Sequence, residues 1–158
     1  MPIPTPTPRQ AAEELARRSL SDFARTMIPS LDLTPFHRSY YDTLDRFARG
    51  EIRRLIVSIP PQHGKSLGSS VLLPAYLLGR QPDRRIALAS YNLRLASRFN
   101  RQIQRLMDAS AYRSVFPRTR LKRSSAKDRG TLRTAEEFEL VGSRGGLLSV
   151  GRDGAPTG

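Results

Sequence analysis

The sequence contains no cysteine, and only two of its 158 residues are histidines. The lack of cysteine excludes disulfide bonds, thiolate metal ligands and cysteine nucleophiles. The two histidines, His37 and His63, stand 26 positions apart, so a metal site built on histidine is not expected.

Long apolar runs are also missing. No stretch approaches the roughly 18 consecutive apolar residues of a transmembrane helix, so no membrane span is expected. The first residues, Met-Pro-Ile-Pro-Thr-Pro-Thr-Pro, have neither the basic start nor the apolar core of a signal peptide. Residues 1–8 are therefore predicted to form an extended, disordered leader.

Acidic residues are few: 14 Asp and Glu stand against 27 Lys and Arg, which gives a formal net charge of +13. Only three of the basic residues are lysines. This balance favours a polyanionic partner, most simply nucleic acid. The alternative is compositional, because a G+C-rich genome raises the arginine content and many of these side chains would then be solvated surface.

The most informative stretch is Ile56–Ser66, which reads Ile-Val-Ser-Ile-Pro-Pro-Gln-His-Gly-Lys-Ser. The apolar run over residues 55–59 predicts a strand buried on both faces, and residues 67–78 predict a helix. A strand, a loop ending in Gly-Lys-Ser and a helix form the context of a phosphate-binding P-loop. Backbone N–H groups near Gly64 and the helix N-terminus would bind phosphate oxygens.

Within this loop, Lys65 is expected to reach the β- and γ-phosphates of ATP, and Ser66 to ligate Mg²⁺. The loop departs from the usual pattern, since Ile59 replaces a glycine and Pro60 and Pro61 have no N–H group. An ordinary strand-to-helix turn is the alternative. The predicted nucleotide-binding residues of the loop are Pro61, Gln62, His63, Gly64, Lys65 and Ser66.

Two helices are predicted before the loop. Apolar residues three or four apart predict a packing helix over residues 9–28, within an N-terminal helical segment 9–30. Thr34 as N-cap and Pro35 at the first helical position begin the second helix, and Gly50 ends it.

The start of the second helix is a candidate base-binding site. Phe36 or Tyr40 would stack on an adenine ring, and His37 would hydrogen-bond the edge of the base. The alternative interpretation is a helix-face histidine beside a core phenylalanine.

Strands and helices alternate beyond the loop. Arg85–Tyr91 predicts a second core strand, and Asn92 caps a helix that runs to about Asp108. Residues 131–141 and 146–150 predict two further strands. The residues of the helix predicted to point inward are Leu95, Phe99, Ile103 and Leu106, and those predicted to form a basic stripe are Arg94, Arg98, Arg101 and Arg105.

This order of elements predicts an α/β fold, an incomplete P-loop NTPase-type sheet with flanking helices, over residues 31–158. Ser90 and Tyr91 would lie at the carboxyl end of their strand, where ligands bind in such sheets.

Residues 112–133 are rich in basic side chains and are predicted to be a loop. One interpretation is contact with a nucleic-acid backbone, and the other is a mobile, solvated loop. The candidate nucleic-acid contacts are Arg118, Arg120, Lys122, Arg123, Lys127 and Arg129.

A catalytic acid is missing. Hydrolysis of ATP needs an Asp after an apolar strand to hold Mg²⁺, and no four apolar residues precede an Asp here. Glu136, Glu137 and Glu139 are better explained as part of an exposed hairpin. The sequence therefore predicts ATP binding with little turnover, assigns no catalytic residue, and is expected to be the amino-terminal part of a longer protein.

Together these features resemble the amino-terminal ATPase region of the large terminase subunits of tailed phages, which are DNA-packaging motors. The resemblance covers about residues 30–158. The similar stretches are Phe36-His37-Arg38, Ser58–Ser66, Ala89–Asn92 with Leu95-Ala96, and Gly145–Gly151 running into Pro156-Thr157-Gly158.

The resemblance implies ATP and Mg²⁺ at Lys65 and Ser66, and His37 in place of an adenine-reading glutamine. It also implies double-stranded DNA, a portal protein and a small terminase subunit as partners. The whole protein would form a homo-oligomeric ring in the cytoplasm of the bacterial host, with a nuclease domain after this region. The alternatives are a P-loop helicase-type ATPase stimulated by nucleic acid, and a non-enzymatic basic nucleic-acid-binding prophage remnant.

Overall fold

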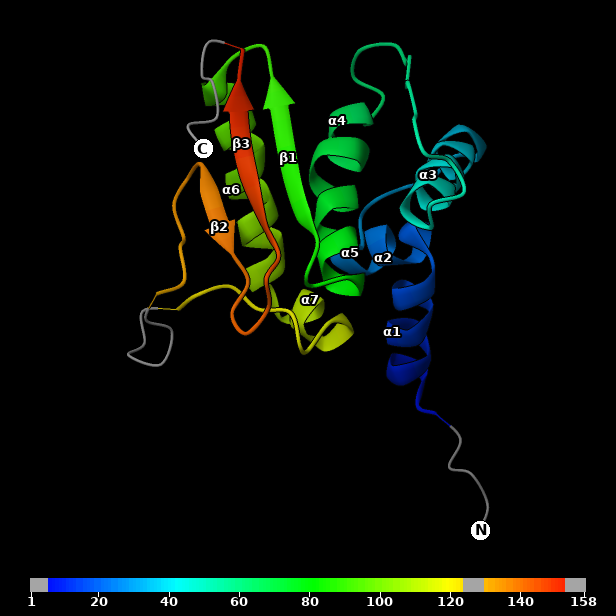
Figure 1. The fold of residues 1–158 in the computed structure, drawn as a ribbon. Helices are drawn as coiled ribbons and strands as arrows, with labels where there is room; N and C mark the ends of the chain where they lie inside the picture. Colours follow the sequence, from blue (N-terminus) through cyan, green and yellow to red (C-terminus); the bar gives the residue numbers. More distant parts are fainter. Residues whose placement is uncertain (1–5, 124–129, 153–158) are drawn as a thin grey trace. The chain divides into compact units, whose positions relative to one another are not determined.

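The computed structural model describes residues 6–123 and 130–152 and divides the chain into two compact units, Met1–Ser58 and Ile59–Gly158 (Figure 1). The first unit is helical, and the second combines helices with a small sheet. In the described part of the chain, every helix falls short of the length and hydropathy that a membrane-spanning segment needs.

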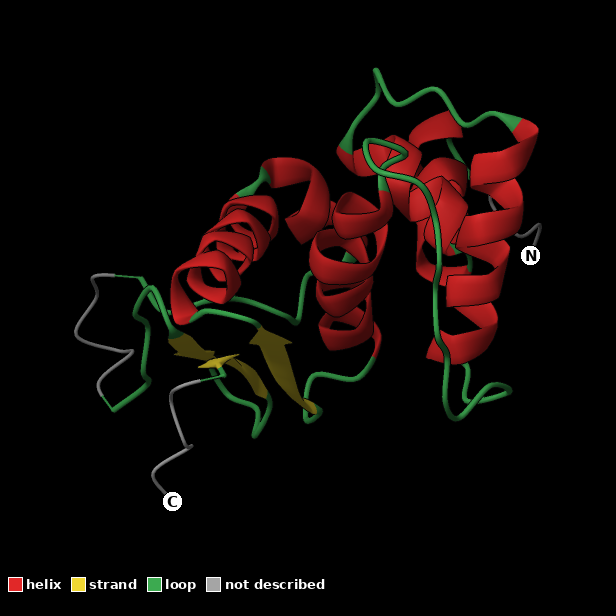
Figure 2. Cartoon of the chain, turned by 90° about the horizontal axis from the view of Figure 1, so that it is seen from above, coloured by secondary structure: helices red, strands yellow, loops and turns green. Residues whose placement is uncertain are grey.

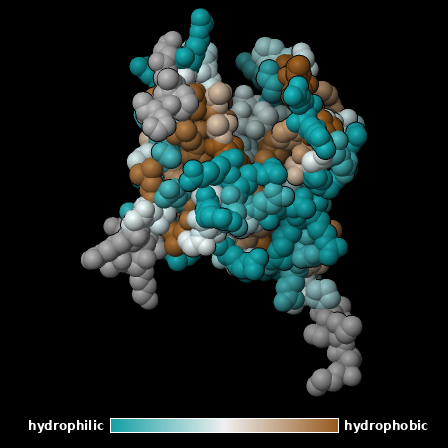
Figure 3. Space-filling model, viewed as in Figure 1, coloured by the Kyte–Doolittle hydropathy of each residue, from teal (hydrophilic) through white to brown (hydrophobic). Residues whose placement is uncertain are grey.

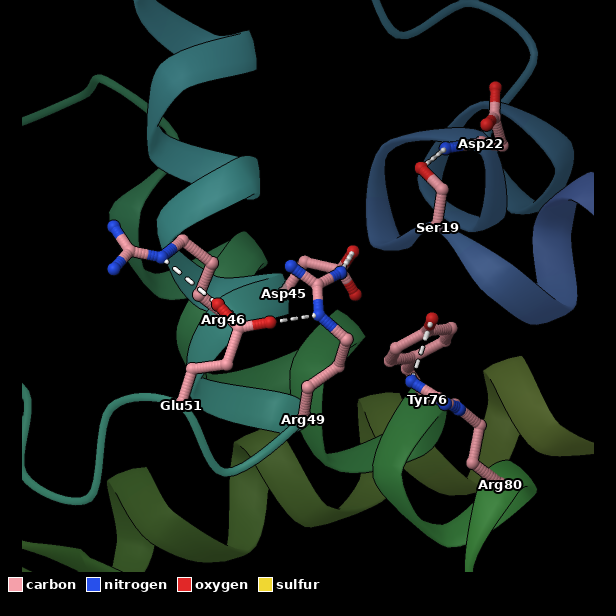
Figure 4. Close-up of polar contacts among 8 residues, drawn as sticks. All are labelled: Ser19, Asp22, Asp45, Arg46, Arg49, Glu51, Tyr76 and Arg80. Atoms are coloured by element: carbon pink, nitrogen blue, oxygen red, sulfur yellow. Dashed lines mark hydrogen bonds and ion pairs between the residues drawn. The ribbon is translucent and has the colours of Figure 1, made fainter.

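The first unit begins with two helices, α1 (Pro8–Arg18) and α2 (Leu20–Met27), where the sequence predicts one. Ser19 separates them because its backbone is extended, with φ −131° and ψ 129°, and its hydroxyl accepts the N–H of Asp22 (Figure 4). A serine that caps a new helix ends the preceding one. The apolar periodicity continues across this break, so it predicts the helical content correctly and misses the break.

Helix α3 (Pro35–Ala48) confirms the predicted caps. The Thr34 hydroxyl accepts the N–H of His37, and Gly50 follows the helix with a φ of +81°. At this end Arg49 pairs with Asp45 at 2.6 Å and with Glu51 at 2.7 Å (Figure 4). The hydrogen bond from Arg49 lowers the pKa of the Glu51 carboxyl.

The second unit starts with a helical run made of α4 (Lys65–Leu67), a π-helical turn η1 (Gly68–Leu72) and α5 (Leu73–Arg80). Pro74 has no N–H group, which predicts a kink. The change of hydrogen-bond register absorbs it, since Leu73 donates to the carbonyl of Gly68, five residues back. Near the end of the run, Arg80 donates to the Tyr76 hydroxyl at 3.4 Å (Figure 4).

The sheet has three strands in the order β1-β3-β2. Strand β1 (Arg85–Ser90) pairs in parallel with β3 (Gly146–Gly151), and β2 (Glu137–Glu139) pairs antiparallel with β3. Helix α6 (Leu93–Asp108), capped by Asn92, packs on β1 and β3, and α7 (Ser110–Val115) follows it. The prediction of an α/β fold is confirmed at this level, as a small mixed sheet with flanking helices.

Within the described part of the second unit, the helices lie on one side of the strands (Figure 2). On the other side, apolar surface is exposed over β1 and β3 (Figure 3). A hollow of about 220 Å³ lies there, and its lining includes Ala87, Leu148, Glu137 and Glu139.

The predicted strand at residues 55–59 is wrong. These residues form no strand in the structure, and the Ile56 side chain is 96% exposed. β-Branched residues favour strands only through pairing and burial against neighbours. Among the described residues no strand pairs with this segment, so its apolar sequence is left without the context that would make it a strand.

The predicted inward face of α6 is rotated by about one residue. The structure buries Ala96, Asn100, Ile103 and Met107, of which only Ile103 was predicted. Small and polar residues replace the larger leucines because the helix lies close to β3. Gly151 shows this, since a Cβ there would stand 2.5 Å from the backbone nitrogen of Leu93.

Candidate functional site

The loop that joins residue 59 to the helical run has an unusual backbone. Gln62 has a φ of +64° and Gly64 a φ of +72°. A glutamine with positive φ is uncommon, and such conformations cluster at functional sites. The His63 Nδ1–H donates to the Pro61 carbonyl at 2.8 Å, because a carbonyl can only accept. This bond fixes the loop just before the helix begins.

Gly64 is the N-cap of the helical run. The first hydrogen bond of the run joins the N–H of Gly68 to the Gly64 carbonyl at 3.0 Å. The N–H groups of Ser66 and Leu67 precede this bond, so the helix itself does not use them. The side chains of Lys65 and Ser66 lie in this first turn and are exposed. A cation, a hydroxyl and backbone donors thus gather at the positive end of a helix, which suits an anion.

The loop lies at one end of the second unit. The start of α4 and the carboxyl ends of β1 and β3 stand at the same end (Figure 1). Tyr91, directly after β1, is 71% exposed there. The structure therefore places the start of α4 and the end of β1 at the same end of the second unit. In open α/β sheets ligands bind at the carboxyl ends of the strands.

Ser66 is the only residue that the sequence assigned to a metal. In residues 6–123 and 130–152 no group of three or more His, Asp or Glu side chains is arranged to hold a metal ion. The exposed Ser66 hydroxyl alone could be one ligand of a metal ion whose other ligands come from a bound nucleotide and from water. The prediction of Mg²⁺ therefore depends on ATP.

Phe36 and His37 lie in the first unit. The Phe36 side chain is 44% exposed and meets the His37 ring edge-on, with 5.4 Å between ring centroids. The His37 Nδ1 lies 2.8 Å from the Thr34 hydroxyl. Phe36 is therefore not a core residue, which removes the alternative of a histidine beside a core phenylalanine. Recognition of adenine by the pair stays a prediction.

The basic segment 112–133 is only partly the loop that the sequence predicts. Residues 112–115 belong to α7, with Tyr112 fully buried. Leu121 is buried and bridges to Leu140. Of the predicted nucleic-acid contacts, Arg118, Arg120 and Arg123 are exposed, Lys122 is half-buried, and Lys127 and Arg129 lie outside the described residues.

Arg133, near the end of this basic segment, contacts helix α6. Its guanidinium pairs with Asp108 at 2.5 Å and donates to Gln104 Oε1 at 3.0 Å and to the Lys122 carbonyl at 2.9 Å. Gln104 in turn donates to Asn100 Oδ1 at 2.8 Å. This network ties the segment to α6. In the sequence, this network could have been suspected from Asn100 and Gln104, two amide side chains four residues apart on the inner side of the predicted helix.

Glu136, Glu137 and Glu139 do not form a catalytic cluster. Glu137 and Glu139 lie on β2, facing the hollow on the open side of the sheet. Glu139 Oε2 accepts the N–H of Leu132 at 3.0 Å. Glu136 is exposed. Strands β2 and β3 form the predicted hairpin, but β2 is shorter than the predicted strand over residues 131–141, and Glu137 and Glu139 are half-buried where exposure was predicted. The hollow, with its carboxylates, is unsuited to phosphate.

No protein-family model, characterised protein or solved structure matches this chain.

Proposed function

We propose that this chain is the nucleotide-binding part of an ATP-driven DNA-packaging motor of the terminase large-subunit type. The observation that carries the proposal is the loop before α4. There Gly64 opens the helical run in a left-handed conformation, and Lys65 and Ser66 occupy its first turn. The sequence of that loop, Pro-Pro-Gln-His-Gly-Lys-Ser, is the source of the terminase resemblance.

In the proposed site, backbone N–H groups from Gln62 onward bind the phosphate oxygens. Lys65 would add a charge-assisted contact to the β- and γ-phosphates, and Ser66 would be a protein ligand of the Mg²⁺ that accompanies ATP. The proposal includes the finer fold, a P-loop NTPase-type sheet with flanking helices. It also includes the terminase partners, namely double-stranded DNA, the portal and the small subunit, and a ring in the host cytoplasm.

ATP binding rather than turnover is proposed for this chain. A hydrolytic site needs a carboxylate at the carboxyl end of a strand beside the loop. Among the described residues, Ser90 and Gly151 end β1 and β3, and no carboxylate stands there. We assign no catalytic residue.

Thermal unfolding with Mg²⁺-ATP tests the proposal. A ligand at 100 times its dissociation constant stabilises the folded state by about 2.7 kcal/mol. For a chain of this length the melting temperature should rise by roughly 5–10 °C. AMP, which lacks the β- and γ-phosphates, is the control and should produce a much smaller shift.

Equal shifts with ATP and AMP would argue against recognition of the phosphates. The absence of any shift with ATP, together with salt-dependent binding of DNA, would favour the non-enzymatic nucleic-acid-binding protein. The observation that favours this second function, nucleic-acid binding without ATP, is the set of exposed arginines on α6.

A further inference from the structure

Helix α6 carries four exposed arginines in one line, which we call the α6 arginine row: Arg94, Arg98, Arg101 and Arg105. At 3.6 residues per turn, their spacing of four, three and four residues places them within a sector of about 60°. With a rise of 1.5 Å per residue, the row is about 16 Å long. No apolar residue of α6 falls inside this sector.

The arginine row faces away from the sheet, because the opposite side of α6 is packed against the rest of the second unit. Ala96, Asn100, Ile103 and Met107 are buried, and α6 packs on β1, β3 and η1. Asn100 donates to the Ser149 hydroxyl on β3 at 3.1 Å. The helix is thus a rigid support with one face on the sheet and the arginine row on the other.

The charge of the row is not neutralised within the described residues. None of its arginines forms an ion pair there. Asp108 is the only acid of α6, and it already pairs with Arg133. Like charges three or four residues apart destabilise an exposed helix slightly, and a polyanion bound along the row would remove this repulsion.

We propose that the α6 arginine row binds the phosphate backbone of duplex DNA. The two strands of a duplex together carry one phosphate charge for about every 1.7 Å of axis, so a straight row of about 16 Å can lie beside at least as many phosphates as it has arginines. Arginine forks make bidentate contacts to phosphate. The lack of apolar side chains in the sector disfavours insertion into a membrane. The inference rests on the proposed function for its partner, and it moves the DNA contact from the segment 118–129 to α6.

The test is the salt dependence of binding to duplex DNA, measured without nucleotide by fluorescence anisotropy. One variant replaces all four arginines of the row by glutamine. Its matched control replaces four exposed arginines that are scattered over the chain and lose the same charge, namely Arg25, Arg53, Arg54 and Arg84. Because each neutralised phosphate contributes about −0.9 to the slope of log K against log salt concentration, the row variant should lose roughly 3 to 4 units of slope.

We expect the row variant to bind duplex DNA more than tenfold more weakly than the unmodified chain, and the scattered control to lose much less. Equal losses in the two variants would overturn the proposal, since they would reflect net charge alone. It would also be overturned if the unmodified chain failed to bind DNA, or bound polyglutamate or anionic vesicles as tightly through the same row. Should the fourfold variant fold poorly, the double variant Arg98→Gln with Arg101→Gln should lose about half of the effect. The ATP-dependent melting shift is a separate readout, so either proposal can fail alone.

Discussion

Replacing Lys65 by alanine is expected to weaken the binding of Mg²⁺-ATP by roughly 10- to 150-fold. A hydrogen bond to a charged group contributes about 1.5–3 kcal/mol, and every 1.4 kcal/mol is tenfold in affinity. Lys65 lies in the first turn after the left-handed Gly64, and its side chain is exposed. Its removal should therefore act on the ligand more than on the fold. Isothermal titration calorimetry measures the affinity.

The matched control is Arg80→Ala, which removes one positive charge from the other end of the same helical run. Arg80 contacts Tyr76, so this variant should lose a little stability and no affinity for ATP. An unchanged affinity in the Lys65 variant would remove the loop from the site. Similar losses in both variants would point to general electrostatics and not to a phosphate contact.

Replacing Gly145 by alanine is expected to destabilise the fold by about 3 kcal/mol, because overpacking against a rigid backbone is costly. The added Cβ would collide with the Pro82 carbonyl oxygen and stand 2.6 Å from that of Arg84. Both neighbours are backbone atoms, which cannot change rotamer to make room. The melting temperature should fall by roughly 6–12 °C in differential scanning calorimetry.

Gly142 provides the comparison in the same turn. It has a φ of +75°, and a Cβ added there would meet nothing within 4 Å, so alanine should cost only the left-handed backbone, about 1–2 kcal/mol. Asparagine, which tolerates that conformation, should cost less. If Gly145→Ala were no worse than Gly142→Ala, close packing would not be the reason for glycine at position 145.

The same crowding explains much of the glycine-rich stretch that contributes to the terminase resemblance. A Cβ at Gly146 would collide with the Phe138 carbonyl oxygen, and Gly151 lies against the start of α6. These glycines bring β3 close to its neighbours. Their presence is therefore accounted for by packing, and the resemblance depends mainly on the loop before α4.

Elements defined by local chemistry could be predicted from the sequence. Thr34 and Asn92 cap helices as expected, because a side-chain hydroxyl or amide oxygen that accepts a helical N–H acts within three residues. Gly50 ends α3 for an equally local reason, its left-handed backbone. The strand β1 was also found, with Ser90 at its end.

Elements that depend on residues far away in the sequence could not be predicted. Residues 55–59 have strand-forming side chains but no paired neighbour in the described chain, and the inward face of α6 is set by β3. The role of Arg133 follows from Asp108 and Gln104, residues more than 20 positions away. Periodicity counts apolar residues, so it cannot identify a buried amide network or a glycine needed for close approach.

For the candidate site too, the local features could be predicted from the sequence and the others could not. The loop from Pro61 to Ser66 was predicted as a local motif that leads into a helix, and a helical run does begin at Lys65. Phosphate binding by this loop stays a prediction. The positive φ of Gln62 was not predicted, since no residue type other than glycine signals it reliably. The basic segment 118–129 was chosen by charge density alone, whereas the structure shows which arginines are aligned and unpaired.

The most direct test of the central claim, that the loop before α4 binds the phosphates of ATP, is a titration with Mg²⁺-ATP followed by the amide chemical shifts of each residue in NMR spectra. The largest shifts are predicted for Gln62 to Leu67, with smaller ones at Ser90 and Tyr91. Saturable binding that left the amides of Gln62 to Leu67 unmoved would contradict the claim, as would no binding at millimolar ATP.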